Sequence, residues 1–311
     1  MRFLAVSLAI VALGTLASCA HAPSSTPAVG AEVPVARAYA LVDGVTGQVL
    51  TELELNERIA RARAIFVGEQ HDNPHHHFVQ SRIYELATQQ PGATGLGLEM
   101  LSRNHQDALS AFVTGSLDEP AFLKAVDWEQ SWGYSYGFFR EMLQRCRTLG
   151  FPAFALNAPR TLSRAVSQKG LEGLDEDERA ALPELVVGPA EHREFVRQAY
   201  GVHSTRRFVE RRFERFYRAQ LLWDETMAES LARALSGPGH PARVVVLAGE
   251  GHTRRAAIPE RLQRRGDFPY LTILAVEADE RDDAIFEQAA DVLFVFTEPR
   301  KPESQPGPAA P

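Results

Sequence analysis

The sequence predicts a three-layer α/β fold, in which helices cover both faces of a largely parallel β-sheet. Four short apolar segments, at 64–68, 94–98, 151–156 and 244–248, each end on a polar or glycine-rich turn. Segments with helical apolar spacing separate them. Strands that alternate with helices are the pattern of a parallel sheet. We therefore expect one α/β domain over residues 37–298, with a helical region inserted before the last of these four strands.

The composition is that of an ordinary globular protein, with 45% hydrophobic and 23% charged residues. A chain of 311 residues buries roughly three quarters of its extended surface, which is enough for a full core. The formal net charge of −7 argues against general nucleic-acid binding. Apart from Cys19 the chain has one cysteine, Cys146, which is expected in the core of a helix at 138–149.

Residues 1–18 have the pattern of a secretion signal, with one arginine before an apolar run. Small residues then lead to Cys19, as in the bacterial lipobox, where the cysteine is lipidated and becomes the new N-terminus. The alternative is an ordinary signal peptide that is cleaved near Ala20 or Ala22. Alanine rather than aspartate after the cysteine favours the outer membrane. No other segment approaches the ~20 apolar residues of a spanning helix. We therefore expect an outer-membrane lipoprotein whose body faces the periplasm or the surface.

The remaining elements follow from local patterns along the chain. Residues 19–36 are rich in proline, alanine and serine and predict a flexible tether, while the tail at 299–311 is predicted to be disordered. Alternation at 39–50 around an Asp-Gly turn predicts a hairpin at the sheet edge, and two further strands are expected at 270–276 and 291–297. The expected helices lie, in chain order, at 53–63, 74–88, 104–113, 119–127, 138–149, 190–235 and 258–265.

Polar side chains follow each of the four strands. Because the carboxyl ends of parallel strands share one edge of the sheet, where ligands bind, these side chains are expected to form one pocket. Gln220 and Asp224 lie one turn apart on an otherwise apolar helical stripe. A buried polar pair is costly unless it is bonded, so the pair is expected to face the same pocket, or else to be satisfied inside the core. The strand-end candidates are Glu69, His71, Glu99, Asn157, Arg160 and His252.

Three kinds of chemistry fit these residues. His71 and His252, with a carboxylate such as Glu69, are a common first set of ligands for a divalent transition metal. A buried glutamate beside a histidine could instead act as general base for hydrolysis. The third interpretation is a hydrogen-bonded network that shapes a binding site without turnover. The residues alone leave these three alternatives open.

Five motifs taken together resemble the ChaN family of haem-binding lipoproteins. They are VGEQHDNPHHH, GLEM followed by Gln106, ALNAPR, AQLLWDETMA and LAGEGH, and they span roughly 65–265. The superfamily that contains this family also contains the Tiki proteases and the erythromycin esterases. The resemblance implies an α/β fold and a haem-linked role in iron uptake, with an outer-membrane haem uptake machinery as a partner. Its alternative implication is a metal-dependent hydrolase that uses Glu69, His71, Glu99 and His252.

The helical region 190–235 is where a haem site is expected. The motif CxxCH is missing from the chain, which excludes covalently attached haem. The resemblance implies tyrosine ligation of the iron, for which Tyr200 is the first candidate and Tyr217 the second. Many arginines in this region alternate with glutamates, which predicts either a salt-bridged face or a site for haem propionates. A break is expected near Gly201, and the surface of this region could pair with its copy in a two-fold dimer that encloses haem. The other candidate haem contacts are His203, Arg206 and Arg207.

Overall fold

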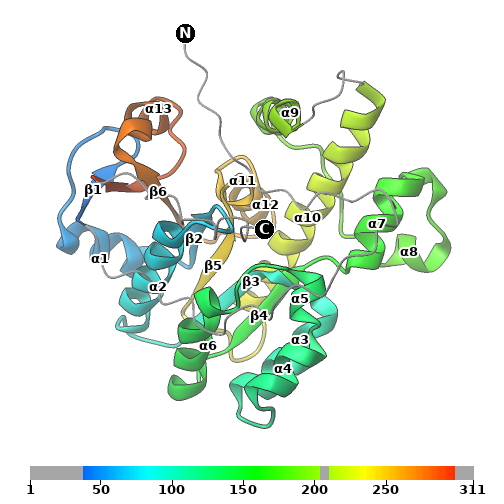
Figure 1. Cartoon of the computed structure of the whole chain (residues 1–311), viewed down its shortest axis with the longest axis horizontal. Helices are drawn as coiled ribbons and strands as arrows, with labels where there is room; N and C mark the ends of the chain where they lie inside the picture. Colours follow the sequence, from blue (N-terminus) through cyan, green and yellow to red (C-terminus); the bar gives the residue numbers. More distant parts are fainter. Residues whose placement is uncertain (1–37, 204–209, 298–311) are drawn as a thin grey trace, which may run out of the picture.

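The computed structural model describes residues 38–203 and 210–297, which build one seven-stranded sheet (Figure 1). The strand order is β1-β7-β6-β2-β5-β3-β4. Every neighbouring pair is parallel except β1 and β7, which are antiparallel. The predicted α/β fold with a largely parallel sheet is confirmed. The strands are β1 Tyr39–Asp43, β2 Ala64–Glu69, β3 Thr94–Ser102, β4 Ala153–Asn157, β5 Arg243–Gly249, β6 Tyr270–Glu277 and β7 Val292–Phe296.

Helices connect the strands and cover both faces of the sheet. Between β1 and β4 lie α1 Glu52–Arg61, α2 Pro74–Thr88, the 3₁₀ turn η1 Arg103–His105, α3 Gln106–Val113, α4 Glu119–Ala125, α5 Trp128–Ser131 and α6 Gly137–Leu149. Between β4 and β5 lie α7 Arg160–Lys169, η2 Leu171–Gly173, α8 Glu176–Ala180, α9 Ala190–His203 and α10 Glu210–Ser236. After β5 come α11 Glu250–Thr253, α12 Ile258–Gln263, η3 Ala278–Glu280 and α13 Arg281–Phe286.

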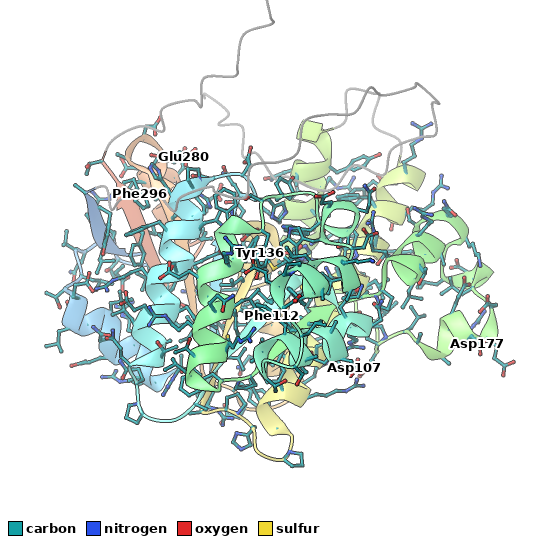
Figure 2. All side chains as sticks on the ribbon, turned by 60° about the horizontal axis from the view of Figure 1, so that its bottom comes forward. Asp107, Phe112, Tyr136, Asp177, Glu280 and Phe296 are labelled. Atoms are coloured by element: carbon teal, nitrogen blue, oxygen red, sulfur yellow. The ribbon has the colours of Figure 1, made fainter. Side chains whose placement is uncertain are left out.

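The two faces of the central strands pack against different helices. In β2, Ile65 and Val67 belong to the core formed with α2, α3 and α6, while Ala64 and Phe66 belong to the core formed with α10 and α12. Side chains alternate along a strand, so a strand that is covered on both faces reads as a continuous apolar run. Figure 2 shows Phe112, which is fully buried, within the first of these helical layers.

Local capping positions the turn between β2 and α2. The side chain of Asn73 accepts a hydrogen bond from the His75 N–H at 3.0 Å, and Pro74 occupies the first turn, where its missing N–H costs nothing. Only four residues therefore lie between the end of β2 and the start of α2, which keeps Glu69 and His71 at the carboxyl end of the sheet. This is the strand, turn and helix that the sequence predicted.

An arm formed by α9 and the first half of α10 rises from the body of the molecule (Figure 1). Its small core contains Val196, Phe213, Tyr217 and Leu221. The second half of α10 packs on β4, α7 and α12 instead. The region 190–235 is divided into α9 and α10, as the break expected near Gly201 implies, but α9 continues through Gly201 to His203. A glycine inside a helix costs only about 1 kcal/mol, which packing of α9 on α10 can offset.

None of the helices in the described ranges is both long and apolar enough to span a membrane. The expected secretion signal, the tether and Cys19 lie outside the described residues, as does the C-terminal tail.

Candidate functional site

Three neighbouring strand ends bring Glu69, Glu99 and Gly249 together, because β5 lies between β2 and β3. The Gly249 N–H donates to Oε2 of Glu99 at 2.6 Å. A Cβ on Gly249 would lie 3.3 Å from the His71 ring, 3.6 Å from Glu99 and 3.7 Å from the His252 ring. Glycine therefore leaves room at a point that these three side chains surround. We call Glu69, His71, Glu99, Asp224 and His252 the strand-end cluster.

The first half of the cluster is a buried glutamate–histidine pair. Oε1 of Glu69 lies 2.7 Å from Nδ1 of His71, and Oε2 of Glu69 accepts from the Gln80 amide at 2.6 Å. Burial disfavours the charged form of Glu69, but the nearby His77 and His71 outweigh it and lower the pKa of Glu69. Burial also opposes charge on His71, but the bond to Glu69 and the charges of Glu69 and Glu99 raise its pKa. The pair is therefore favoured as carboxylate and imidazolium.

The second half of the cluster is a buried aspartate–histidine pair. Nδ1 of His252 lies 2.6 Å from Oδ1 of Asp224, and Nε2 of His252 lies 3.5 Å from Oε1 of Glu99. The Gln220 side-chain nitrogen is 3.0 Å from the same Nδ1. One ring nitrogen cannot donate to Asp224 and accept from Gln220 at once, so the shorter contact to the carboxylate carries the proton. The structure thus brings Gln220 and Asp224 to the strand ends, next to His252.

Electrostatics favour a charged His252. Burial opposes its charge, but the carboxylates of Glu99 and Asp224 outweigh burial and raise the pKa of His252 to about 9. Asp224 is fully buried, which disfavours its charge, yet His252 and His192 hold its pKa well below the usual range. At neutral pH His252 is therefore a proton donor rather than a free base.

The three consecutive histidines of α2 have three different partners. Nδ1 of His75 lies 2.9 Å from Oε1 of Glu277, and Nδ1 of His76 accepts the Gln70 N–H at 2.9 Å. His77 is the one that supports the cluster, because its Nε2 lies 3.1 Å from the His71 carbonyl oxygen and its Nδ1 lies 3.6 Å from Oε2 of Glu69.

Aromatic side chains cover His71. Its ring contacts Trp132 edge-on at 4.6 Å and Tyr134 at 5.0 Å, between ring centres. The Trp128 indole N–H donates to the Tyr134 carbonyl oxygen at 2.8 Å and fixes this segment. Trp132 and Tyr134 therefore form one wall of the site. Burial raises the pKa of the Tyr134 hydroxyl, and the charges of Asp72, Glu69 and Glu99 raise it further.

Asn157 and Arg160 contribute less directly than the sequence suggested. The Asn157 amide donates to the Glu99 carbonyl oxygen at 3.0 Å, so it holds the β3 backbone. Arg160 is exposed and donates to the Gln130 carbonyl oxygen, outside the strand-end cluster. It begins α7, which leads its side chain toward α5. Asn157 thus supports the site from outside, whereas the Arg160 side chain lies at the surface, away from the strand-end cluster.

Two residues of the site were not foreseen. His192, at the start of α9, is buried with Nε2 3.0 Å from Oδ2 of Asp224. Its sequence context is a charged helical segment, which offers no signal for a buried contact. Glu250 is also buried, and burial raises its pKa to about 7. Its place between two glycines in the turn before His252 could have marked it as part of the site.

Two of the haem candidates, Tyr200 and Tyr217, lie on the arm. Tyr200 is half-buried, with its ring 5.8 Å from Phe213 and 5.2 Å from Phe216. Tyr217 is buried, and its hydroxyl lies 3.3 Å from Nδ1 of His192. Tyr200 is therefore the more accessible of the two tyrosines. His203 ends α9 but its side chain is not described, and Arg206 and Arg207 lie outside the described residues.

The structure gives the metal hypothesis no support. Within 38–203 and 210–297, no group of three or more histidine, cysteine, aspartate or glutamate side chains is arranged to hold a metal ion.

Comparisons with known proteins agree with the fold. A structure of ChaN of Campylobacter jejuni, described as showing cofacial heme binding, has 16% sequence identity and a TM-score of 0.66, and the match covers 84% of this chain and 97% of that one. A structure of an erythromycin esterase mutant, EreC, in its open conformation has 10% sequence identity and a TM-score of 0.47. The match covers 78% of this chain and 77% of that one. No curated protein matches the sequence.

The sequence pattern that defines one protein family matches residues 55–262, which is more than half of the chain. That family is described as haem-binding uptake proteins of the Tiki superfamily, ChaN. The matched range begins in α1 and ends in α12, so it contains β2, β3, β4 and β5 with the whole strand-end cluster, as well as the arm. The chain belongs to the ChaN family of haem-binding uptake proteins, in the Tiki superfamily.

Proposed function

We propose that this protein is a lipid-anchored haem-binding protein that takes part in bacterial haem or iron uptake. Membership of the haem-binding uptake family supports the haem part of this proposal. The lipobox ending at Cys19 supports an anchor in the outer membrane, with the body facing the periplasm or the surface. The partner would be an outer-membrane haem uptake machinery that delivers haem or receives it.

The observation that carries the proposal is the half-buried aromatic surface of the arm. Haem is flat and apolar across its faces, so its site needs aromatic or aliphatic walls and a donor for the iron. On the arm, Tyr200 stands beside Phe216, and Phe195 is half-buried under the guanidinium of Arg254, which lies 4.2 Å from the ring centre. Arg254 also pairs with Glu287 at 3.2 Å. These side chains fit the flat faces of haem, and the Tyr200 hydroxyl would supply the oxygen ligand to the iron.

A second copy of the chain would complete the site. A surface formed by two helices that rise from the body covers one face of a flat ligand and leaves the other open to a partner. Two-fold pairing places the same surface opposite itself, so two arms would enclose haem between them. We therefore expect haem to promote a homodimer, and sedimentation velocity with and without haemin measures this directly.

The decisive experiment is a haemin titration of the mature protein, followed by absorbance. Tyr200→Phe removes one oxygen and keeps the ring, so its packing on Phe213 and Phe216 is retained. We expect Tyr200→Phe to weaken haemin binding by at least about tenfold, which corresponds to about 1.4 kcal/mol. Tyr217→Phe tests the second candidate, and because its hydroxyl faces His192 inside the protein, it should weaken binding clearly less than Tyr200→Phe does. Unchanged binding by Tyr200→Phe would exclude this tyrosine as the iron ligand.

The metal-dependent hydrolase is the weaker alternative. The same protein preparation tests it, because metal content can be measured before haemin is added. One transition metal retained per chain, lost in His252→Ala together with esterase activity, would support the hydrolase. Metal-free protein that binds haemin supports the proposal made here.

A further inference from the structure

One buried carboxylate joins the arm to the strand-end cluster. Oδ1 of Asp224 contacts Nδ1 of His252 at 2.6 Å, and Oδ2 contacts Nε2 of His192 at 3.0 Å. Asp224 is fully buried and His192 is 1% exposed, so water does not replace either partner. His252 belongs to the turn after β5, whereas His192 belongs to α9. Each oxygen of one side chain thus serves a different part of the molecule.

His192 also fixes the base of α9 against two other helices. Its Nδ1 lies 3.3 Å from the Tyr217 hydroxyl on α10 and 3.4 Å from Nη2 of Arg261 on α12. Arg261 is fully buried and is held by the carbonyl oxygens of Ala256 and Ala257 at 2.8 and 2.9 Å. A shift of α9 relative to α10 would therefore move His192 away from Asp224.

A continuous series of contacts leads from this point to the aromatic surface of the arm. The Tyr217 ring is stacked at 5.9 Å on Phe213, and Phe213 lies 5.8 Å from Tyr200, between ring centres. Two helical turns separate His192 from Tyr200 on α9. A ligand that packs against Tyr200 therefore acts on the helix that carries His192.

The energetic reason for coupling is the cost of an unpaired buried carboxylate oxygen. A buried charged group that loses one partner loses more than a neutral group would, because water does not replace the missing partner. When His192 withdraws, Asp224 keeps its charge but loses a donor, and its contact with His252 must adjust. Conversely, a change at His252 alters how firmly Asp224 holds His192. Such an effect is reciprocal by thermodynamic necessity.

We propose that His192 is a positioning residue which, through Asp224, couples the arm to the strand-end cluster. A ligand on the arm alters the order of the turn at 249–253, and a change in the cluster alters affinity at the arm. The identity of the arm ligand as haem rests on the proposed function, whereas the coupling itself does not.

The first experiment needs no ligand and compares two amide substitutions. His192→Gln places its amide where Nε2 was and can still donate to Asp224, whereas His192→Asn reaches only the position of Nδ1, near Tyr217. Hydrogen exchange of the amides at 249–253 is the readout. His192→Asn should speed exchange there by at least about fivefold, the lower end of typical coupling, and His192→Gln should restore most of the protection.

A packing control separates coupling from general loosening of the arm. Val196 is 3% exposed in the core of the arm, and its aliphatic side chain has no group that could donate to Asp224. Val196→Ala should speed exchange within α9 but raise it at 249–253 by much less than His192→Asn does, because the contact between His192 and Asp224 is kept. Two outcomes overturn the proposal. One is equal exchange at 249–253 in Val196→Ala and His192→Asn, and the other is unchanged exchange there in His192→Asn.

The second experiment is a double-mutant cycle on haemin affinity. His252→Gln, His192→Asn and the double variant are titrated with haemin beside the parent protein. We expect the two effects to be non-additive by at least about fivefold, because both act through Asp224. Additive effects overturn the coupling. If Tyr200→Phe binds haemin like the parent, the proposed haem site on the arm is wrong. The hydrogen-exchange experiment still tests the coupling through His192, because it needs no ligand.

Discussion

The raised pKa of His252 predicts that the protein loses stability as pH rises above neutrality. Its pKa in the folded protein is about 9, against 6.5 for an ordinary histidine, because the carboxylates of Glu99 and Asp224 outweigh the effect of burial. The folded state therefore holds a proton that the unfolded chain has released between these two pH values. A pKa difference of this size corresponds to about 3 kcal/mol. This contribution is fully present below pH 6.5 and is lost as pH rises through about 9.

Urea unfolding of the mature protein between pH 6 and pH 10 measures this loss. The free energy of unfolding should fall over this range, and His252→Gln should remove most of the fall because it takes away the titrating group. His240→Gln is the control, because His240 is exposed and should leave the slope unchanged. A His252→Gln variant that keeps the full pH dependence would falsify the assignment of this proton to His252.

Three further predictions concern other parts of the molecule. Burial raises the pKa of Glu250 to about 7, so this carboxyl destabilises the fold as pH rises from 4.5 through about 7. In urea unfolding, Glu250→Gln should therefore be more stable than the parent at pH 8 but not at pH 4.5. A Glu250→Gln variant that is less stable than the parent at pH 8 contradicts this. Gly249→Ala places a methyl group 3.3 Å from the His71 ring, which must shift by a few tenths of an ångström, so the free energy of unfolding in urea should fall by about 1 kcal/mol, the low end of overpacking, and an unchanged value contradicts this. Cys19→Ala should release the protein from the membrane fraction or block its processing, and a variant that fractionates and migrates like the parent contradicts lipidation.

The sheet and the strand ends were predictable because their signals are local. The apolar run before Glu69 and the Asn73-Pro74 pair after it define a strand, a turn and a helix without help from the rest of the chain. The order of the strands then follows only from packing. Nothing in the sequence near Gly249 tells that β5 inserts between β2 and β3 and so brings Glu69 next to Glu99.

The misses are residues whose roles depend on distant elements. His192 lies in a charged helical segment, and its burial depends on α10 and α12, which fold against it. Arg160 follows a strand end as the cluster residues do, yet the start of α7 leads its side chain to the surface. Tyr217 and Tyr200 could not be separated by spacing, because the difference between them is the inward contact of the Tyr217 hydroxyl with His192.

The position of β5 also has a consequence for how the chain folds. β2 and β3 each pair with β5, which is made only after the long helical excursion from α7 to α10. A chain that has emerged only as far as α9 has β2 and β3 but lacks the strand that joins them. Pairing across such a sequence distance is slow, and the open strand edges meanwhile favour aggregation. The acid–histidine cluster is therefore among the last features to assemble, and the unfinished chain would need protection until β5 arrives.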